Sequence, residues 1–314
     1  MSDIFIAKEK EATSKAEVEA IEPLIQSKKE EHKPAKEVLV NVCVDMSESF
    51  STPNGSFYVG TTEPEIANAV KLAAASHLFI YSCDVHCADT LEFEANGGSF
   101  PPHNLILSDS TTLRSAGVPV GKSASPRPVS ALCEALRGRP SGIIAPRHVF
   151  FQSGKERPDF SIPDLEAAFG TKWIHDSTEI SSGRCTYVVS GVTLFNGATL
   201  HILRSQAGVH YEGVPDSDCN VFALLREKYG HGTGLHFVVT GAVLSISVYQ
   251  TASNIKQMLP KAKVTIAWDA CTPLPQKEGE KEKDRKDWVD IVDKMSRQIG
   301  ITVATTESVL SSIN

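Results

Sequence analysis

The chain has 314 residues, of which 41% are hydrophobic and 22% are charged. This balance is that of an ordinary globular protein, and the length allows one large α/β domain or two small ones. A net charge of -7 argues against nucleic acid or an anionic membrane surface as a main partner. No apolar run is long enough to span a bilayer, and seven scattered cysteines argue against a disulfide framework.

The first 36 residues are dominated by lysine and glutamate, as in the run Ser27–Lys33. Such a segment is either a solvated helix of mixed charge or a disordered arm, and we expect a mostly flexible arm at 1–36. The start of the chain lacks the apolar core of a secretory signal and is too rich in glutamate for a typical mitochondrial presequence. We therefore expect a cytoplasmic protein.

From Val38 onward, short apolar runs alternate with amphipathic stretches. This alternation predicts an α/β domain at 37–314, with a parallel sheet covered on both faces. The predicted strands are 38–44, 77–83, 148–151, 186–189, 236–239, 264–268 and 301–304, and the predicted helices are 65–75, 129–136, 221–228, 247–258 and 287–298.

Two segments do not follow this alternation. The stretch of about 104–200 contains Ser/Thr-rich and Pro-rich pieces, which predict a large insertion or accessory lobe. The Lys/Glu-rich segment 276–283 is typical of a solvated loop before the last helix.

Polar residues gather where the predicted strands end. In a parallel sheet, the ligand crevice lies beyond the carboxyl ends of the strands, and Asp45, Asp84, Gly241 and Asp269 fall at such ends. Chemistry is therefore expected at this edge of the sheet.

Asp84 and His86 lie two positions apart at a strand end, so that their side chains share one face. His103 follows a diproline further along the chain. Carboxylate and neutral imidazole groups suit zinc, iron or manganese. The pattern predicts a divalent-metal site at Asp84, His86 and His103, and the alternative is a surface aspartate with two unrelated histidines.

Several segments match a known family pattern in the same order. They are Cys43–Phe50 and Gly55–Val59, Ser82–Asp89 and Asn96–His103, Thr240–Val248, and Thr251–Ala252 with Trp268–Pro273. Together they resemble the nicotinamidase and pyrazinamidase branch of the isochorismatase-like cysteine hydrolases, in a diverged form. The resemblance covers about 38–103 and about 221 to the end of the chain. It implies a three-layer α/β/α fold with a mainly parallel sheet.

The resemblance also implies a chemistry. In that family a cysteine at the start of a helix attacks a carboxamide, and the resulting thioester is hydrolysed to acid and ammonia. A metal ion is held near the ring nitrogen of the substrate. Carried over by position, Asp45 is the base and Asp84, His86 and His103 are three metal ligands. Zinc is the expected metal, with iron and manganese as alternatives.

Three positions depart from the family pattern. The nucleophile position holds Ser247, whose hydroxyl is far less acidic than a thiol and needs a positioned base. His236 and His103 are candidates to approach it in the fold. A fourth metal-ligand position, usually histidine, holds Thr90, and a glutamine position near the base holds Ser47.

The family's catalytic lysine is assigned here to Lys155, which follows a predicted strand. Counting back along the sequence from Ser247 instead puts the position of this lysine near Arg204 or Ser205. Arginine does not lose its proton readily, so Arg204 could support charge but could not shuttle protons.

Other motifs have structural explanations that weigh more. Cys83 and Cys87 could belong to a zinc site, but buried structural cysteines are more common. The segment 117–123 imitates a phosphate-binding loop, yet it is one residue too short between its glycines and follows no strand. Ser247 could simply be a favourable residue at a helix N-terminus.

Two classes of function follow from these motifs. The first is a catalytically impaired or altered member of the family, acting as a pseudoenzyme or binding scaffold, because serine replaces the nucleophilic cysteine. The alternative is an active metal-assisted amidohydrolase that deamidates nicotinamide or a related small carboxamide. The expected ligand is a small carboxamide or a related molecule. A protein partner bound through the insertion or the arm, and a homo-oligomer, are left open.

Overall fold

The computed structural model describes residues 37–90, 92–139, 141–144, 162–171, 185–190, 225–226, 228–273 and 281–313. The arm expected at 1–36, the predicted strand 148–151 and Lys155 lie outside these residues, as does most of the predicted helix 221–228.

A seven-stranded sheet forms the centre of the described part of the chain, and all its strand pairs are parallel. The strand order is β3-β4-β2-β1-β5-β6-β7. The strands are β1 Val38–Val44, β2 Leu78–Asp84, β3 Ser141–Ile144, β4 Cys185–Ser190, β5 Leu235–Ala242, β6 Lys263–Thr272 and β7 Thr302–Ala304. β2 and β5 are buried along their whole length, as expected of apolar runs in a sheet covered on both faces.

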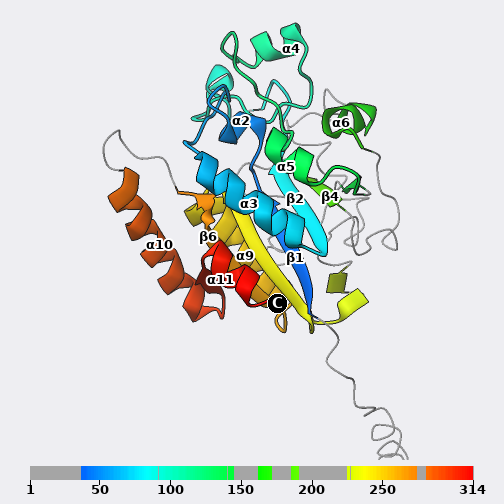
Figure 1. The fold of residues 1–314 in the computed structure, drawn as a ribbon. Helices are drawn as coiled ribbons and strands as arrows, with labels where there is room; N and C mark the ends of the chain where they lie inside the picture. Colours follow the sequence, from blue (N-terminus) through cyan, green and yellow to red (C-terminus); the bar gives the residue numbers. More distant parts are fainter. Residues whose placement is uncertain are drawn as a thin grey trace, which may run out of the picture. The chain divides into compact units, whose positions relative to one another are not determined.

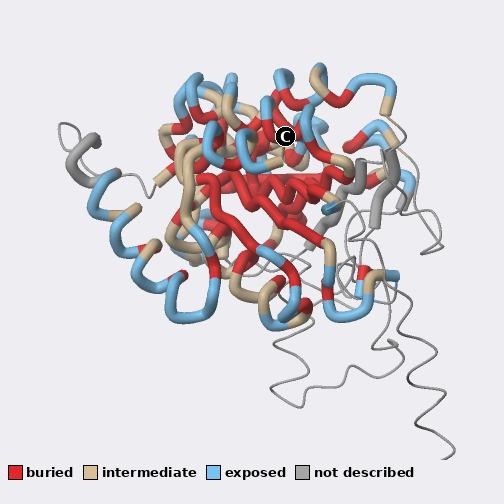
Figure 2. The backbone as a smooth tube through the Cα atoms, turned by 60° about the horizontal axis from the view of Figure 1, so that its bottom comes forward, coloured by how far each residue is buried: buried red, intermediate tan, exposed pale blue. Residues whose placement is uncertain are grey.

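Helices cover the sheet on both sides (Figures 1 and 2). They are α2 Glu48–Ser51, α3 Glu63–Ala75, α4 Ser110–Ser115, α5 Ser130–Ala135, α6 Ile162–Phe169, α9 Tyr249–Met258, α10 Lys281–Gln298 and α11 Thr306–Ser311, with a 3-10 turn η1 Glu94–Asn96 and a π-helical turn η4 Leu244–Val248. One apolar cluster joins the sheet to α3, α5, α6 and α11, and a second joins its other face to α9 and α10. The predicted three-layer α/β/α architecture is confirmed. Among the helices in the described ranges, none combines the length and apolar character needed to cross a bilayer.

The alternation of side chains along the central strand explains this arrangement. Leu39 and Cys43 of β1 point into the first cluster, whereas Val40, Val42 and Val44 point into the second. Successive residues of a strand face opposite sides of the sheet, so a continuous apolar run supplies both layers at once. The run at 38–44 is therefore the middle of the molecule's core.

Parts of the sequence prediction were incomplete or wrong. β3 was not predicted, and both β3 and β4 lie within the stretch 104–200, so part of that stretch belongs to the central sheet. α10 begins at Lys281, and residues 281–283 are therefore helical although we expected a loop there. Lysine and glutamate are good helix formers, and their charge alone does not mark a loop.

Asp269 lies within β6 and has a structural role. Its Oδ1 accepts hydrogen bonds from the backbone N–H of Thr306 at 2.7 Å and from the Thr306 hydroxyl at 2.9 Å. Its Oδ2 accepts one from Asn68 on α3 at 3.2 Å. Asp269 thus ties two helices to the strand, and the chemistry expected at this strand end is not centred on it.

Candidate metal centre and active site

The sheet order places three functional segments side by side. β2, β1 and β5 are neighbours, and their carboxyl ends lead to Asp84, Asp45 and the turn that contains Ser247. Because adjacent strands lie only about 4.8 Å apart, residues far apart in the sequence meet at this edge. This is the crevice position expected for parallel sheets.

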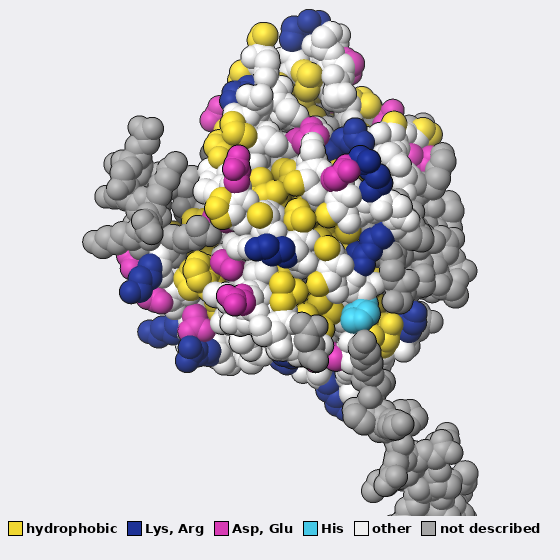
Figure 3. All heavy atoms as spheres, in the orientation of Figure 1, with side chains coloured by type: hydrophobic (Ala, Val, Ile, Leu, Met, Phe, Trp, Pro, Cys, Tyr) yellow, Lys and Arg dark blue, Asp and Glu magenta, His cyan; other side chains and the backbone are white. Residues whose placement is uncertain are grey.

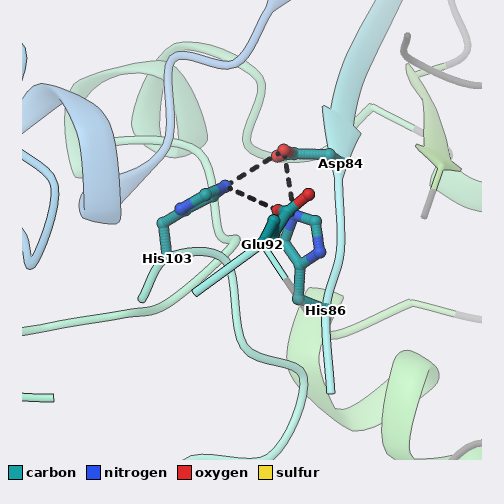
Figure 4. Close-up of side chains that lie close together, drawn as sticks. All are labelled: Asp84, His86, Glu92 and His103. Atoms are coloured by element: carbon teal, nitrogen blue, oxygen red, sulfur yellow. Dashed lines mark hydrogen bonds and ion pairs between the residues drawn. The ribbon is translucent and has the colours of Figure 1, made fainter. Parts of the chain in front are cut away.

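Four side chains converge beyond the end of β2: Asp84, His86, Glu92 and His103 (Figure 4). Each offers a ligand atom, and these atoms all lie within 4.8 Å of one another. Asp84 Oδ2 lies 3.0 Å from Nε2 of His86 and 3.3 Å from Nε2 of His103. Glu92 Oε1 lies 3.1 Å and 3.6 Å from the same two nitrogens. The cluster is buried except for Glu92, which is half-buried.

These separations fit a metal ion. Ligand atoms about 2.0–2.2 Å from a tetrahedral metal lie roughly 3.3–3.6 Å from one another, close to the range seen here. His103 Nδ1 donates to the carbonyl of Pro101 at 2.7 Å, which leaves Nε2 free to act as a ligand. Two nitrogens and two carboxylate oxygens suit zinc, iron or manganese, and they do not select among them.

Glu92 was missed by the sequence analysis, which placed the altered fourth metal position at Thr90. The Thr90 hydroxyl donates to the backbone carbonyl of Cys87 at 2.8 Å. Glu92 takes part instead, from the loop between the two predicted ligand segments. A carboxylate two residues beyond the expected position was the available signal, but only the loop conformation brings it to the histidines.

Asn104 holds the Asp84 carboxylate in place. Its Nδ2 donates to Asp84 Oδ1, while its backbone carbonyl accepts a hydrogen bond from the N–H of His86 at 3.0 Å. Asn104 is fully buried and has a left-handed backbone with φ of 46°. Asparagine tolerates this conformation better than most residues. With Oδ1 held by Asn104, Oδ2 of Asp84 faces the two imidazoles.

The charges of the cluster shift its pKa values. Burial acts to raise the pKa of Asp84, but the charges and hydrogen bonds of His86 and His103 outweigh it and leave that pKa far below the usual range. Burial also raises the pKa of Glu92, and the two histidines oppose the change only partly. Burial acts to lower the pKa of His86, yet Asp84 and Glu92 leave it raised. These pKa shifts mean that a positive charge is stabilised at the point where the four side chains meet.

Asp45 and Ser247 are brought together, as the family pattern implies. Burial and the charge of Asp84 raise the pKa of Asp45 well above its usual range, and a hydrogen bond from Ser247 acts in the opposite direction. Asp45 has a left-handed backbone with φ of 51°, and its Oδ1 accepts the N–H of Asp84 at 3.4 Å. Such strain in a residue other than glycine is often found at functional sites.

The turn before Ser247 depends on a glycine. Gly241 has φ of 115°, and a Cβ added there would lie 1.8 Å from the carbonyl oxygen of Val44. Only glycine allows β1 and β5 to approach so closely. The chain then enters the π-helical turn η4, and Ser247 lies within it, half-buried, rather than at a helix N-cap. Ser247 therefore lies near the N-terminal end of the helical run that starts at Leu244, but it is not the N-cap.

His236 is not the base for Ser247. It lies at the start of β5, where Nε2 is 2.9 Å from the Thr265 hydroxyl and Nδ1 is 3.5 Å from the Glu37 carboxylate. The site lies at the opposite end of this strand. His103, the other candidate, belongs to the metal cluster.

Aromatic rings lie against one side of the metal cluster. The ring centroids of Phe50 and Phe57 lie 4.9 Å and 5.2 Å from that of His103, and Phe100 lies 6.0 Å from Phe57. All three phenylalanines are half-buried. Ser47, at the position where the family often has glutamine, caps α2 by accepting the N–H of Phe50 at 3.2 Å. It thereby holds the backbone at Phe50, the phenylalanine whose ring lies nearest to His103.

The buried thiols do not take part in the cluster. Burial raises the pKa of Cys43 to about 12 and the pKa of Cys83 well above its usual value, so neither thiol forms a nucleophilic thiolate at neutral pH. Cys83 instead makes a weak contact of 3.9 Å with the carbonyl of Pro126. Among the described residues, the metal cluster contains no cysteine, in line with a structural role for Cys83 and Cys87.

Comparison with known proteins returns solved structures of low similarity. No protein-family model matches the chain, and no curated protein matches it. Yeast nicotinamidase covers 85% of this chain and 99% of its own, at 14% identity and a TM-score of 0.44. The match to the pyrazinamidase of Pyrococcus horikoshii in complex with zinc covers 85% of this chain and 98% of that one, with 13% sequence identity and a TM-score of 0.42. The match to an isochorismatase-like hydrolase from Alkaliphilus metalliredigens covers 89% of this chain and 100% of that one, with 10% sequence identity and a TM-score of 0.38. The names of these solved structures give the types of protein that the sequence motifs resemble.

Proposed function

We propose that this protein is a diverged nicotinamidase-like protein that binds a divalent metal ion and, beside it, a small heteroaromatic carboxamide or related molecule. Its catalysis is impaired or altered relative to the cysteine hydrolases. The observation that carries the proposal is the convergence of Asp84, His86, Glu92 and His103 on one point. Two buried histidines facing two carboxylates at these distances are best explained by a shared cation.

The aromatic side chains support the choice of ligand. Phe50 and Phe57 are half-buried and lie beside His103, so they offer flat apolar faces next to the metal ligands. A planar heteroaromatic ring can pack against such faces while its ring nitrogen is directed at the cluster. The bound metal would supply a Lewis acid for that nitrogen, and the protein's own contribution is to orient the ring.

The serine at position 247 supports the impaired or altered chemistry. A thiol can be brought into its reactive form near neutral pH by its surroundings, whereas a hydroxyl requires a base to accept its proton during attack. Asp45 is the group placed to do this, and no described histidine other than the cluster's own lies at this end of the sheet. Deamidation is therefore expected to be slow or absent.

Metal analysis of the purified protein tests the proposal. We expect close to one divalent ion per chain in the wild type, with zinc as the first choice and iron or manganese as alternatives, and a large loss in His103→Ala. His231→Ala is the matched control, because His231 is exposed and outside the cluster. A protein that binds no divalent metal at micromolar concentrations, or whose metal content is the same in both variants, would disprove the proposal.

Ammonia release from nicotinamide tests the catalytic part. The wild type should show little activity, whereas Ser247→Cys should raise the rate if the nucleophile is the principal defect. Binding of nicotinamide to the metal-loaded protein, followed by calorimetry, should occur in both forms. The same calorimetry on metal-free protein should show weaker binding.

A second candidate function is an active serine-dependent amidohydrolase, and the effect of Ser247 on the pKa of Asp45, which requires the two side chains to be neighbours, favours it. In this reaction the Ser247 proton passes to Asp45 as the oxygen bonds to the amide carbon. The proton then returns to the departing ammonia, and water hydrolyses the resulting ester to acid and free Ser247. Rapid deamidation by the wild type that is abolished by Ser247→Ala would establish this function instead.

A further inference from the structure

The outer side of α10 carries a line of exposed apolar residues. Ile291 and Met295 of α10, and Ile299 directly after its last residue, are 46%, 40% and 40% exposed, and they follow one another at intervals of four residues. This spacing places Ile291 and Met295 on one side of the helix, with Ile299 at its end, a set we call the α10 stripe. Val292 and Ser296, on the adjoining side, are buried, and Val292 belongs to the second apolar cluster. The stripe therefore extends the apolar face of the helix beyond what the core covers.

Large exposed apolar side chains are few in the described part of the chain. The α10 stripe accounts for three of the five, and the other two, Tyr58 and Val120, lie elsewhere. Single exposed apolar residues are normal, whereas a continuous set on one helix face marks a contact surface.

The charges beside the stripe suggest its partner. Asp287 and Lys294 are both exposed and lie seven residues apart, so they fall on the same flank of α10, on either side of Ile291. Acidic and basic side chains are interspersed along this helix at the lower left of the space-filling view (Figure 3). When two identical helices pair in antiparallel fashion, each flank meets the same flank of the other helix in reverse order. Asp287 then meets the partner's Lys294, and Lys294 meets the partner's Asp287.

We propose that α10 pairs with α10 of a second copy of this chain, antiparallel and about a two-fold axis near Ile291. The pairing places Ile291 against the partner's Ile291 and Met295 near the partner's Trp288. Contacts repeated across a two-fold axis are the usual basis of homodimers. A parallel pairing would bring this flank against the core-facing side of the other helix and would leave both charges without a counterpart.

The expected dimer is weak. A standard interface takes roughly 20–30 residues from each side, and a single helix of 18 residues supplies fewer. We therefore expect a monomer–dimer equilibrium with a dissociation constant on the order of 10–100 µM.

Sedimentation equilibrium of the full chain between about 1 and 300 µM tests the proposal. The wild type should shift from monomer to dimer over this range. Asp287→Lys should weaken association at least tenfold, because two such charges then face the two copies of Lys294. Lys294→Asp should do the same, and the double charge exchange should restore association. Asp290→Lys is the matched control, since Asp290 is exposed on the same helix but lies away from the stripe.

A further variant, Met295→Lys, should abolish the dimer while leaving the thermal unfolding midpoint of the monomer nearly unchanged, because Met295 is exposed. A protein that stays monomeric at the highest concentration overturns the proposal. So does a dimer that Asp287→Lys and Asp290→Lys affect equally, since its interface would then lie elsewhere.

Discussion

Oε1 of Glu92 lies 3.1 Å from Nε2 of His86, although Glu92 stands in a loop and His86 follows a buried strand. This contact gives the cluster a second carboxylate. In the metal site proposed above, Glu92 would be the fourth donor, two residues after Thr90, where the nicotinamidase pattern has a histidine. The proposed site would then keep four donors in a different composition.

Replacing this carboxylate should weaken metal binding. Glu92→Gln keeps the shape of the side chain but removes its charge, so we expect metal affinity to fall about 10- to 100-fold, as for other groups that tune metal sites. Competition with a chromophoric chelator measures the change. Glu94→Gln is the matched control, because Glu94 is exposed and outside the cluster. Equal affinities for the two variants would mean that Glu92 is not a ligand.

Removing the Asn104 side chain should release Asp84. Asn104→Gly keeps a residue that accepts the positive φ, so its effect reports on the lost hydrogen bond to Asp84 Oδ1. We expect about tenfold weaker metal binding and a loss of about 1–3 kcal/mol in unfolding free energy. Chelator competition and urea unfolding measure the two effects. Asn104→Ala should cost more stability, because alanine does not tolerate this backbone conformation.

A methyl group at Gly241 should not be accommodated. The Cβ of Gly241→Ala would lie 1.8 Å from the carbonyl oxygen of Val44, so the two central strands must separate. We expect a loss of more than about 3 kcal/mol in unfolding free energy, or failure to fold. Gly60→Ala is the control, because Gly60 also has positive φ but has no atom within 4 Å of an added Cβ. Its cost should be about 1 kcal/mol, the backbone strain alone.

The stability of the protein should fall in mild acid partly through His236. Burial and the charge of Lys263 lower its pKa to about 4, although the Glu37 carboxylate lies 3.5 Å away. The folded protein thus binds this proton less readily than the unfolded chain, whose histidines titrate near 6.5. His236 contributes no penalty above about pH 6.5, and a penalty on the order of 2 kcal/mol develops as the pH falls from 6.5 toward 4.

His236→Gln isolates this effect. The difference in unfolding free energy between the wild type and the variant, measured in urea from pH 4 to pH 8, should be constant at high pH and shift in favour of the variant below about pH 6. A pH-independent difference would show that His236 titrates in the folded state as it does in the unfolded chain.

The sequence was most informative where one physical signal dominated. The continuous apolar runs at 38–44 and 77–83 predicted buried strands of a parallel sheet, and the spacing of Asp84 and His86 placed both at one strand end. β3 escaped prediction because Ser141–Ile144 is short, contains glycine and follows a proline. Its place in the sheet is set by pairing with β4 rather than by its own residues.

The site residues that strands position were predicted, whereas two that loops position were missed. Asp45, Asp84 and His86 could be predicted because they lie at the ends of strands or directly after them. Glu92 and Asn104 depend on loop conformations, including the positive φ of Asn104, which no periodic pattern in the sequence encodes. The wrong choice of His236 as a candidate base has a similar cause, because membership of a strand does not say which end of it faces the crevice.

The adjacency of β2, β1 and β5 also gives Asp45 a central place. β1 lies between the other two strands, so Asp45, which follows β1, stands between the metal cluster beyond β2 and the turn beyond β5. Its Oδ1 accepts the N–H of Asp84 at 3.4 Å, and Ser247 contributes to lowering its pKa. The order of three strands thus makes one carboxylate the shared neighbour of both halves of the site, so a change at Asp45 would reach both halves at once.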